Sequence, residues 1–463
     1  MDSILKSIPT ASDGLRARPT QQLDHLPGTP GHWLTGNMNG LLSNLGPFVR
    51  EQQALHGNCF TLGLFRNKRV VMMVGTAANE KILLDKEDNF SNLWGWDVLQ
   101  ELFGRNLIVR DFADHRQHRR LMTQAFKPTA LANYLRKMNL LISGAIEDYD
   151  GVVDVYVQTK RLALDIALEV FAGMPAGCET KELNRDLSTI LSNAMAHRIR
   201  LPGTRYYRAL RSRDRLRHRL AAELKLRRQS NGTDLFSTLA RQKDPEGRAL
   251  SDADVLDHMF GMLFAAHDTT ASSLSMIFWL LAKNPIWQER LRKQCLALNK
   301  QTASKQLAYE DLSRLPELEW TFKEALRLYA PLQLIPRRVV REFEFEGVRI
   351  PANTALYLVP QAVHFDPNHF SNPETFDPER FSQPQRSDSG FAFIPFGKGS
   401  HMCLGMHFAH MEIKAVLYSV LLSKQLSVSS SAEADIEYLP IVRPSAPMMV
   451  DFKPIEHQLS EEA

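Results

Sequence analysis

One of the four cysteines lies among glycines, immediately before a helical pattern. Cys403 belongs to Phe-Ile-Pro-Phe-Gly-Lys-Gly-Ser-His-Met-Cys-Leu-Gly, residues 393–405, and apolar residues spaced three to four apart predict a helix over residues 404–422. A buried thiolate needs a metal ion, the amino end of a helix or loop N–H groups to stabilise it. These residue types therefore suit an iron–thiolate site, in which Gly405 would let the helix lie against a flat macrocycle.

A free cysteine is more often a small buried apolar residue than a metal ligand. We expect this role for Cys59, Cys178 and Cys295. The four cysteines form no Cys-x-x-Cys pair and have no regular spacing, which argues against a disulfide framework and a structural zinc site. Among the four cysteines, only Cys403 lies in a loop whose residue types suit a metal ligand.

A carboxylate and a hydroxyl stand side by side in the otherwise apolar stretch 259–270. Burying Asp268 and Thr269 is unfavourable unless they have partners or a function. Splitting dioxygen consumes two protons, and an acid beside an alcohol can pass protons along a held water network. Asp268 and Thr269 are therefore candidates for a proton relay. The alternative is a solvent-facing Asp beside a Thr that bonds to a carbonyl of the preceding turn.

Two further polar groupings have ordinary explanations when taken alone. Glu324 and Arg327 are three residues apart and share a helix face, and such pairs are usually solvated surface contacts worth under about 1 kcal/mol. His115 and Arg119 lie in the run His-Arg-Gln-His-Arg-Arg, which would ordinarily form a solvated basic helix face.

In their order along the chain these segments resemble the motifs of the cytochrome P450 family. The cysteine loop matches Phe-x-x-Gly-x-[Arg/His]-x-Cys-x-Gly, which implies Cys403 as axial haem ligand, Phe396 near the sulfur and His401 on a haem propionate. Histidine at that position is similar to soluble bacterial members. Residues 265–269 resemble [Ala/Gly]-Gly-x-[Asp/Glu]-Thr, with Ala265 against the haem and Ala266 in place of the usual glycine.

The resemblance also implies roles for the Glu324–Arg327 pair and for His115 and Arg119. Glu324 and Arg327 match Glu-x-x-Arg, and Phe-Asp-Pro-Glu-Arg-Phe at 376–381 supplies Arg380 as the third member of a structural cluster that holds the cysteine loop. His115 and Arg119 match propionate-binding positions. Arg337 matches another such position, although the neighbouring Arg338 fits almost as well.

The remaining elements agree with a mainly α fold with small β-sheets. We predict a hairpin within residues 56–76, helices over 77–330, strands within 343–358, a long coil at 364–389 and short strands at 436–452. The resemblance implies the cytochrome P450 fold as a single triangular haem domain over residues 26–463, after a flexible segment 1–25. No apolar run reaches the ~18 residues of a spanning helix, so we expect a cytoplasmic protein without a transmembrane anchor.

The net charge and the positions of aromatic residues indicate which kinds of ligand the protein could bind. The net charge of +4, from 56 Lys+Arg and 52 Asp+Glu, argues against a nucleic-acid binder, and the basic stretch 205–228 is expected to be a solvated helix face. Family position implies a large apolar substrate, with pocket candidates Trp94, Trp96, Phe103, Phe260 and Phe264. Residues 201–213 are similar to the branch of retinoic acid hydroxylases, sterol demethylases and plant terpenoid oxidases.

The sequence thus predicts a haem b thiolate monooxygenase that hydroxylates an isoprenoid, retinoid, sterol or terpenoid with dioxygen, a fatty acid being the main alternative substrate. No flavin or iron–sulfur segment is recognised, so we expect an NAD(P)H-driven ferredoxin reductase and a ferredoxin docking near Lys398, with the enzyme a monomer. A peroxide-driven enzyme or a haem isomerase needs no acid–alcohol relay. A haem sensor or carrier without turnover, or a nucleic-acid binder, is the alternative from another class.

Overall fold

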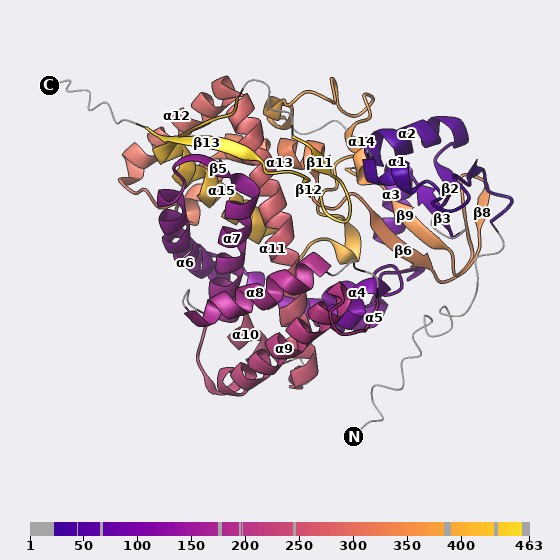
Figure 1. Cartoon of the computed structure of the whole chain (residues 1–463), viewed down its shortest axis with the longest axis horizontal. Coiled ribbons are helices and arrows are strands. Elements are labelled where there is room, and N and C mark those ends of the chain that lie inside the picture. Colours follow the sequence, from indigo (N-terminus) through magenta and orange to yellow (C-terminus); the bar gives the residue numbers. More distant parts are fainter. Residues whose placement is uncertain are drawn as a thin grey trace.

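A computed structural model describes residues 23–43, 45–64, 68–174, 178–193, 196, 198–243, 247–383, 390–429 and 434–455. Most helices lie on one side of the molecule, and the largest sheet lies on the other beside the short helices of the amino-terminal region (Figure 1). The long helix α11 (Asp252–Lys283) passes through the middle. The expected mainly α fold with small sheets is confirmed.

The helices follow the predicted distribution along the chain. The bounds are α1 (Met38–Ser43), α2 (Leu45–His56), α3 (Thr76–Leu84), α4 (Asp97–Phe103), α5 (Phe112–Thr123), α6 (Pro128–Glu147), α7 (Val155–Ala167), α8 (Cys178–Asn193), α9 (Arg205–Gln229), α10 (Leu235–Arg241), α11, α12 (Pro285–Thr302), α13 (Pro316–Tyr329), α14 (Pro360–His364) and α15 (Met406–Ser423). The helix predicted over 404–422 is α15. Across the residues that the structure describes, none of these helices is both long and apolar enough to cross a membrane.

The largest sheet has six strands and contains the predicted hairpin. Its order is β1 (Gly28–Thr29), β2 (Cys59–Gly63), β3 (Arg69–Met73), β9 (Ala355–Leu358), β6 (Ile335–Val339) and β4 (Phe90–Ser91). β2 and β3 pair antiparallel from Cys59–Met73 to Gly63–Arg69. β6 was not predicted, because its sequence Ile-Pro-Arg-Arg-Val lacks the alternation of apolar residues that marks a half-buried strand.

Three smaller sheets complete the β-structure. They join β10 (Lys424–Ser427), β13 (Met449–Pro454) and β5 (Gly151–Asp154); β7 (Phe343–Phe345) and β8 (Val348–Ile350); and β11 (Ile436–Glu437) and β12 (Arg443–Pro444). Helices dominate residues 77–330 as predicted, but the short strands β4 and β5 lie among them and were not predicted. At β5, Gly151 adopts a positive φ of 63° after the end of α6, and the hydrogen-bond partner strand β13 comes from almost 300 residues further along the chain.

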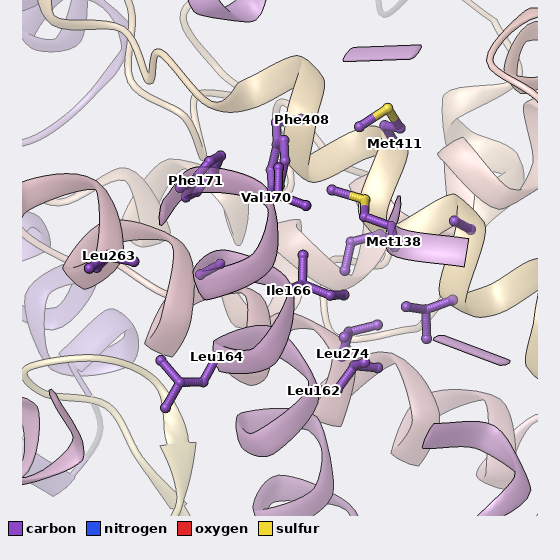
Figure 2. Close-up of a cluster of buried hydrophobic side chains, with 14 of the residues drawn as sticks. Met138, Leu162, Leu164, Ile166, Val170, Phe171, Leu263, Leu274, Phe408 and Met411 are labelled. Carbon is purple, nitrogen blue, oxygen red and sulfur yellow. The ribbon is translucent and has the colours of Figure 1, made fainter. Parts of the chain in front are cut away.

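The core lies where α6, α7, α11 and α15 meet. Figure 2 shows Met138 of α6, Leu162 and Ile166 of α7, Leu274 of α11 and Met411 of α15 in one buried cluster. From Val255 to Ala282 most residues of α11 are buried, as is typical of a helix surrounded by protein. This packing fixes α11 in place, and with it the Asp268–Thr269 pair.

The basic helix α9 has an exposed face, and several of its arginines also form ion pairs with carboxylates of neighbouring segments. Among them are Arg215 with Asp186 of α8 and Arg217 with Asp257 of α11. The carboxylates come from other parts of the chain, so the local excess of basic residues gave no sign of them. These ion pairs join α9 to α8 and α11.

A buried charge cluster ties α13 to the coil that leads to the cysteine loop. Arg327 forms a two-pronged pair with Glu324, with both distances 2.8 Å and both side chains fully buried. Arg380 donates to the same carboxylate at 3.1 Å. Arg327 also donates to the carbonyls of His364 and Pro373 at 2.9 and 2.7 Å. The cluster thereby fixes the coil against α13.

Replacing Arg327 with Met will destabilise the fold strongly, because it leaves the Glu324 carboxylate buried with too few partners. The expected loss in the free energy of unfolding is about 3–5 kcal/mol, measured by urea denaturation. The control is Arg290→Gln, which breaks the partly exposed pairs with Glu317 and Glu379 and should cost under about 1 kcal/mol. Equal losses for the two variants would contradict a structural role for the buried cluster.

Candidate functional site

A cavity of about 350 Å³ opens between α5, α11, the strand β6 and the cysteine loop. Its wall brings together most of the residues singled out from the sequence, although they come from five separate segments. These are Trp96, His115, Arg119, Phe264, Ala265, Asp268, Thr269, Arg337, Phe396, His401, Cys403 and Gly405.

The cysteine loop is a tight turn fastened to the end of α3. Cys403 donates its backbone N–H to the carbonyl of Phe396 at 2.9 Å, which closes the loop. Gly397 and Gly399 have φ angles of 66° and 69°, a region that favours glycine. At Gly399 a side chain is also excluded by space, because a Cβ would lie 1.9 Å from the carbonyl oxygen of Leu83. The glycines therefore set the path that presents Cys403.

The Cys403 side chain is accessible from the cavity although it lies deep inside the protein. Burial raises the pKa of its thiol, while the Gly405 N–H and the Arg119 guanidinium act in the opposite direction. The thiolate therefore needs a metal ion to be the stable form. Cys59 and Cys295 are buried, and burial raises the pKa of each to about 12, which suits inert core residues. The side chain of Cys178 lies outside the described residues.

Basic side chains gather beside the cysteine. The rings of His115 and His401 stack with centroids 3.7 Å apart, and Nδ1 of His115 has no hydrogen-bond partner among the described residues. Arg337 is buried and donates to the carbonyl of Pro336 at 2.8 Å. Burial lowers its pKa to about 10, against the opposing influence of Asp111 and Asp85. Within the described ranges neither Arg119 nor Arg337 forms an ion pair, so both can accept an anionic ligand.

The strand β6 determines which of the neighbouring residues Arg337 and Arg338 faces the cavity. Successive residues of a strand point to opposite faces. Arg337 faces the cavity, whereas Arg338 is absent from the cavity wall and donates to the carbonyl of Asn353 at 3.1 Å.

The residues of the cavity fit a haem. The cavity is lined by the Cys403 thiol, which needs a metal ion to ionise, and by Arg119 and Arg337, whose charges a pair of carboxylates would neutralise. It also has an open surface at Gly405. A Cβ added at Gly405 would meet only the Cys403 sulfur, at an ordinary contact distance of 4.0 Å. The chain itself therefore leaves the space beside Gly405 free for a flat group.

The acid–alcohol pair also borders the cavity, on α11. Asp268 forms ion pairs with Lys160 of α7 at 3.1 Å and with Nδ1 of His267 at 3.0 Å. Burial disfavours its charged form, but His267 and Lys160 outweigh burial and lower the pKa to about 2. Thr269 donates its hydroxyl to the carbonyl of Ala265 at 2.6 Å. Asp268 is thus an internal, paired carboxylate rather than a solvent-facing one, whereas Thr269 makes the bond to the preceding turn.

Comparison with known proteins decides the family. A family model described as Cytochrome P450 matches residues 26–452. The chain belongs to the cytochrome P450 family.

Its relatives include bacterial and plant members. Cytochrome P450 136 of Mycobacterium tuberculosis is 33% identical over 78% of this chain and 74% of its own length. Taxane 10-beta-hydroxylase of Taxus cuspidata is 29% identical over 84% of this chain and 81% of its own. The solved structure of retinoic acid bound cyanobacterial CYP120A1 covers 93% of this chain and 100% of its own, with a TM-score of 0.84 and 28% identity. Family and relatives make this chain a P450 monooxygenase, and the family implies a haem-thiolate cofactor.

The predicted substrate pocket of this P450 needs correction. Trp96 and Phe264 border the cavity, but Trp94, Phe103 and Phe260 do not belong to its wall. Phe103 and Phe260 are fully buried in the main core, and Phe103 supports Phe264 from behind with ring centroids 4.2 Å apart. Aromatic residues at helical spacing do not reveal which of them face a cavity and which face the core.

Several residues of the P450 site escaped the sequence analysis. Tyr156, His258 and Arg443 also border the cavity. Glu412 is buried on α15, and burial raises its pKa to about 8, while the Thr270 hydroxyl donates to it at 3.5 Å. A signal for Glu412 existed, because it stands in the apolar pattern of 404–422 just as Asp268 stands in that of 259–270. The others carried no local signal.

Gly399→Ala will disturb the cysteine loop far more than Gly397→Ala. Both substitutions place alanine at positive φ, which costs roughly 1–2 kcal/mol. At Gly397 nothing lies within 4 Å of the added carbon, whereas at Gly399 it collides with Leu83. We expect the thermal unfolding midpoint to fall clearly further for Gly399→Ala, and equal midpoints would show that the loop is not pinned to α3.

Proposed function

We propose that this P450 binds haem b through Cys403 and hydroxylates an elongated lipophilic molecule of the isoprenoid type. One observation carries the proposal: the accessible thiol of Cys403 shares a cavity wall with His115, Arg119, Arg337 and His401. Residues 26–463 would form the haem domain, in agreement with the extent of the family match.

The haem-binding role of each residue follows from its position on that wall. Arg119 and Arg337 supply positive charge for the two propionates, and His115 and His401 add ring nitrogens as hydrogen-bond donors. Phe396, Ala265 and Gly405 supply apolar surface against the ring. When bound, a haem with a thiolate ligand supplies the activation of dioxygen and the insertion of one oxygen atom into a C–H bond.

The relay residues would control proton supply on the other side of the cavity. A carboxyl with a pKa of about 2 holds no proton at neutral pH, so Asp268 must receive each proton before passing it on. Lys160, whose ammonium lies 3.1 Å away, holds the Asp268 carboxylate in place beside the cavity. The Thr269 hydroxyl, one residue further along α11, would then position the water that carries the proton to the reacting oxygen.

The substrate class draws on the relatives as well as on the cavity. The relatives named for substrates act on taxanes or hold retinoic acid, and both ligands are isoprenoids. The wall contributed by Trp96, Leu99, Phe264 and Ile335 is apolar, as expected for a ligand held by shape. Electrons would come from an NAD(P)H-driven ferredoxin reductase through a ferredoxin, with the enzyme acting as a monomer.

The haem proposal is tested by the spectrum of the reduced, carbon monoxide-treated protein. The wild type should show the red-shifted Soret band of a thiolate ligand. Cys403→Ser should lose that band, while Cys295→Ser, which alters a buried cysteine of the core, should keep it. A wild-type protein without the band, or a Cys403→Ser variant that retains it, would falsify the assignment of Cys403.

The relay proposal predicts uncoupling. Thr269→Ala should release peroxide and lower the product formed per NAD(P)H oxidised by about tenfold or more, since positioned proton transfer contributes at least that much. Thr238→Ala is the matched control, because Thr238 makes the same bond to the preceding turn, at 2.9 Å, but on α10. Unchanged coupling in Thr269→Ala would remove Thr269 from the mechanism, whereas a wild type that forms no product with any lipophilic probe would favour a sensor or carrier without turnover.

A further inference from the structure

Two buried histidines join α5 to α11 beside the cavity. Nδ1 of His118 lies 2.8 Å from Nε2 of His258. On the far side of His118, Nη1 of Arg110 lies 2.9 Å from Nε2. Arg110 is itself held by carboxylates, through pairs with Asp114 and Asp254. The result is a chain of contacts from Arg110 to His118 to His258.

The charge state of the arginine determines where the protons of both rings lie. A guanidinium can only donate hydrogen bonds, so Nε2 of His118 must accept from Arg110. The proton of a neutral His118 therefore sits on Nδ1 and is donated to Nε2 of His258. With Nε2 accepting, a neutral His258 carries its own proton on Nδ1. This assignment follows from the hydrogen-bond network.

The direction of the chain does not depend on the protonation of His118. Asp114 lies 3.4 Å from Nε2 of His118, so a protonated ring could donate to that carboxylate. Its Nδ1 would still donate to His258. Burial and the Arg110 charge lower the pKa of His118 to about 4 and hold that of His258 well below its usual range, which keeps both rings neutral at physiological pH.

The Nδ1–H of His258 has no hydrogen-bond partner within the described part of the chain. The side chain is fully buried and borders the cavity together with Asn106, Gly261 and Met262. A buried donor without an acceptor costs about 1–3 kcal/mol, which is recovered when an acceptor arrives. The network therefore fixes a donor, rather than an acceptor, beside the cavity.

The position of His258 along α11 gives the donor a definite place in the site. Residues 258, 262, 265 and 269 follow each other at intervals of four, three and four, so they share one face of the helix. Eleven residues at 1.5 Å per residue separate His258 from Thr269 by about 16 Å. A ligand that reaches both ends must be elongated.

We propose that His258 is a specificity residue, which donates a hydrogen bond from Nδ1 to an oxygen acceptor at the end of the substrate remote from the oxidised carbon. The inference rests on the proposed function only in taking this cavity as the substrate site. It narrows the substrate class to elongated apolar molecules with a carbonyl, carboxylate or hydroxyl oxygen at one end. Arg110 and His118 act as positioning residues, because they set the tautomer of His258.

Matched retinoids test the proposal in the haem-loaded protein. The probes are retinoic acid, retinal and deoxyretinol, which share one polyene and differ in whether the terminal group carries an oxygen. Dissociation constants come from titrations followed by the spin-state change in the absorption spectrum. The wild type should bind the two oxygenated probes about tenfold more tightly than deoxyretinol, the gain expected for satisfying one buried donor.

Three variants separate hydrogen bonding from packing. His258→Leu should weaken retinoic acid and retinal about tenfold and leave deoxyretinol nearly unchanged. His258→Asn, whose amide nitrogen stands near the position of Nδ1, should restore part of the preference and also covers the case in which the leucine variant does not fold. Met259→Leu is the control, because Met259 is equally buried next to His258 but is absent from the cavity wall.

The outcomes distinguish this inference from the haem proposal. Equal weakening of all three probes in His258→Leu and His258→Asn, or no preference for oxygenated probes in the wild type, overturns the role of His258. Both results can be obtained while the carbon monoxide spectrum shows the thiolate band. Loss of that band in the wild type would instead count against the haem proposal.

Discussion

The site depends on one electrostatic constraint: the positive charges of Arg119 and Arg337 lie near Cys403 and have no carboxylate in contact among the described residues. Arg337 is buried and Arg119 partly buried, and within the described residues neither has an ion pair to neutralise it. A protein interior tolerates such charge only if an anion completes it. In the proposed site, the two carboxylates and the iron of a haem would satisfy the arginines and the Cys403 thiolate together, which would couple cofactor binding to local stability.

The acid–alcohol pair follows another rule, because it has partners within the protein. Asp268 forms ion pairs with Lys160 and His267, and Thr269 donates to the carbonyl of Ala265. Among the described residues, Nδ1 of His258 has no hydrogen-bond partner. A single helix, α11, thus presents a charged carboxylate at one point and a neutral donor about three turns away, on a core that keeps both rigid.

Much of the architecture could be predicted from local pattern. The hairpin of β2 and β3 and the helix α15 follow from alternation and helical spacing. β5 could not be predicted because its partner strand β13 lies almost 300 residues further along the chain, and β6 because its sequence lacks the alternation of a half-buried strand. The same limit applies to α9, whose arginines looked free only because Asp186 and Asp257 belong to other helices.

The sequence by itself determined the chemistry of the site, because glycine, cysteine, acid and alcohol at fixed spacing restrict the backbone and the reaction locally. It placed Cys403 in its loop and Asp268 beside Thr269. Only the tertiary structure decided which side chains face the cavity: Arg337 rather than Arg338, Phe264 rather than Phe260, and His258, which no motif marked. Which side chains face the cavity depends on how segments distant in sequence pack together. The direction of a hydrogen bond depends on a neighbouring group such as Arg110, which fixes the acceptor nitrogen of His118.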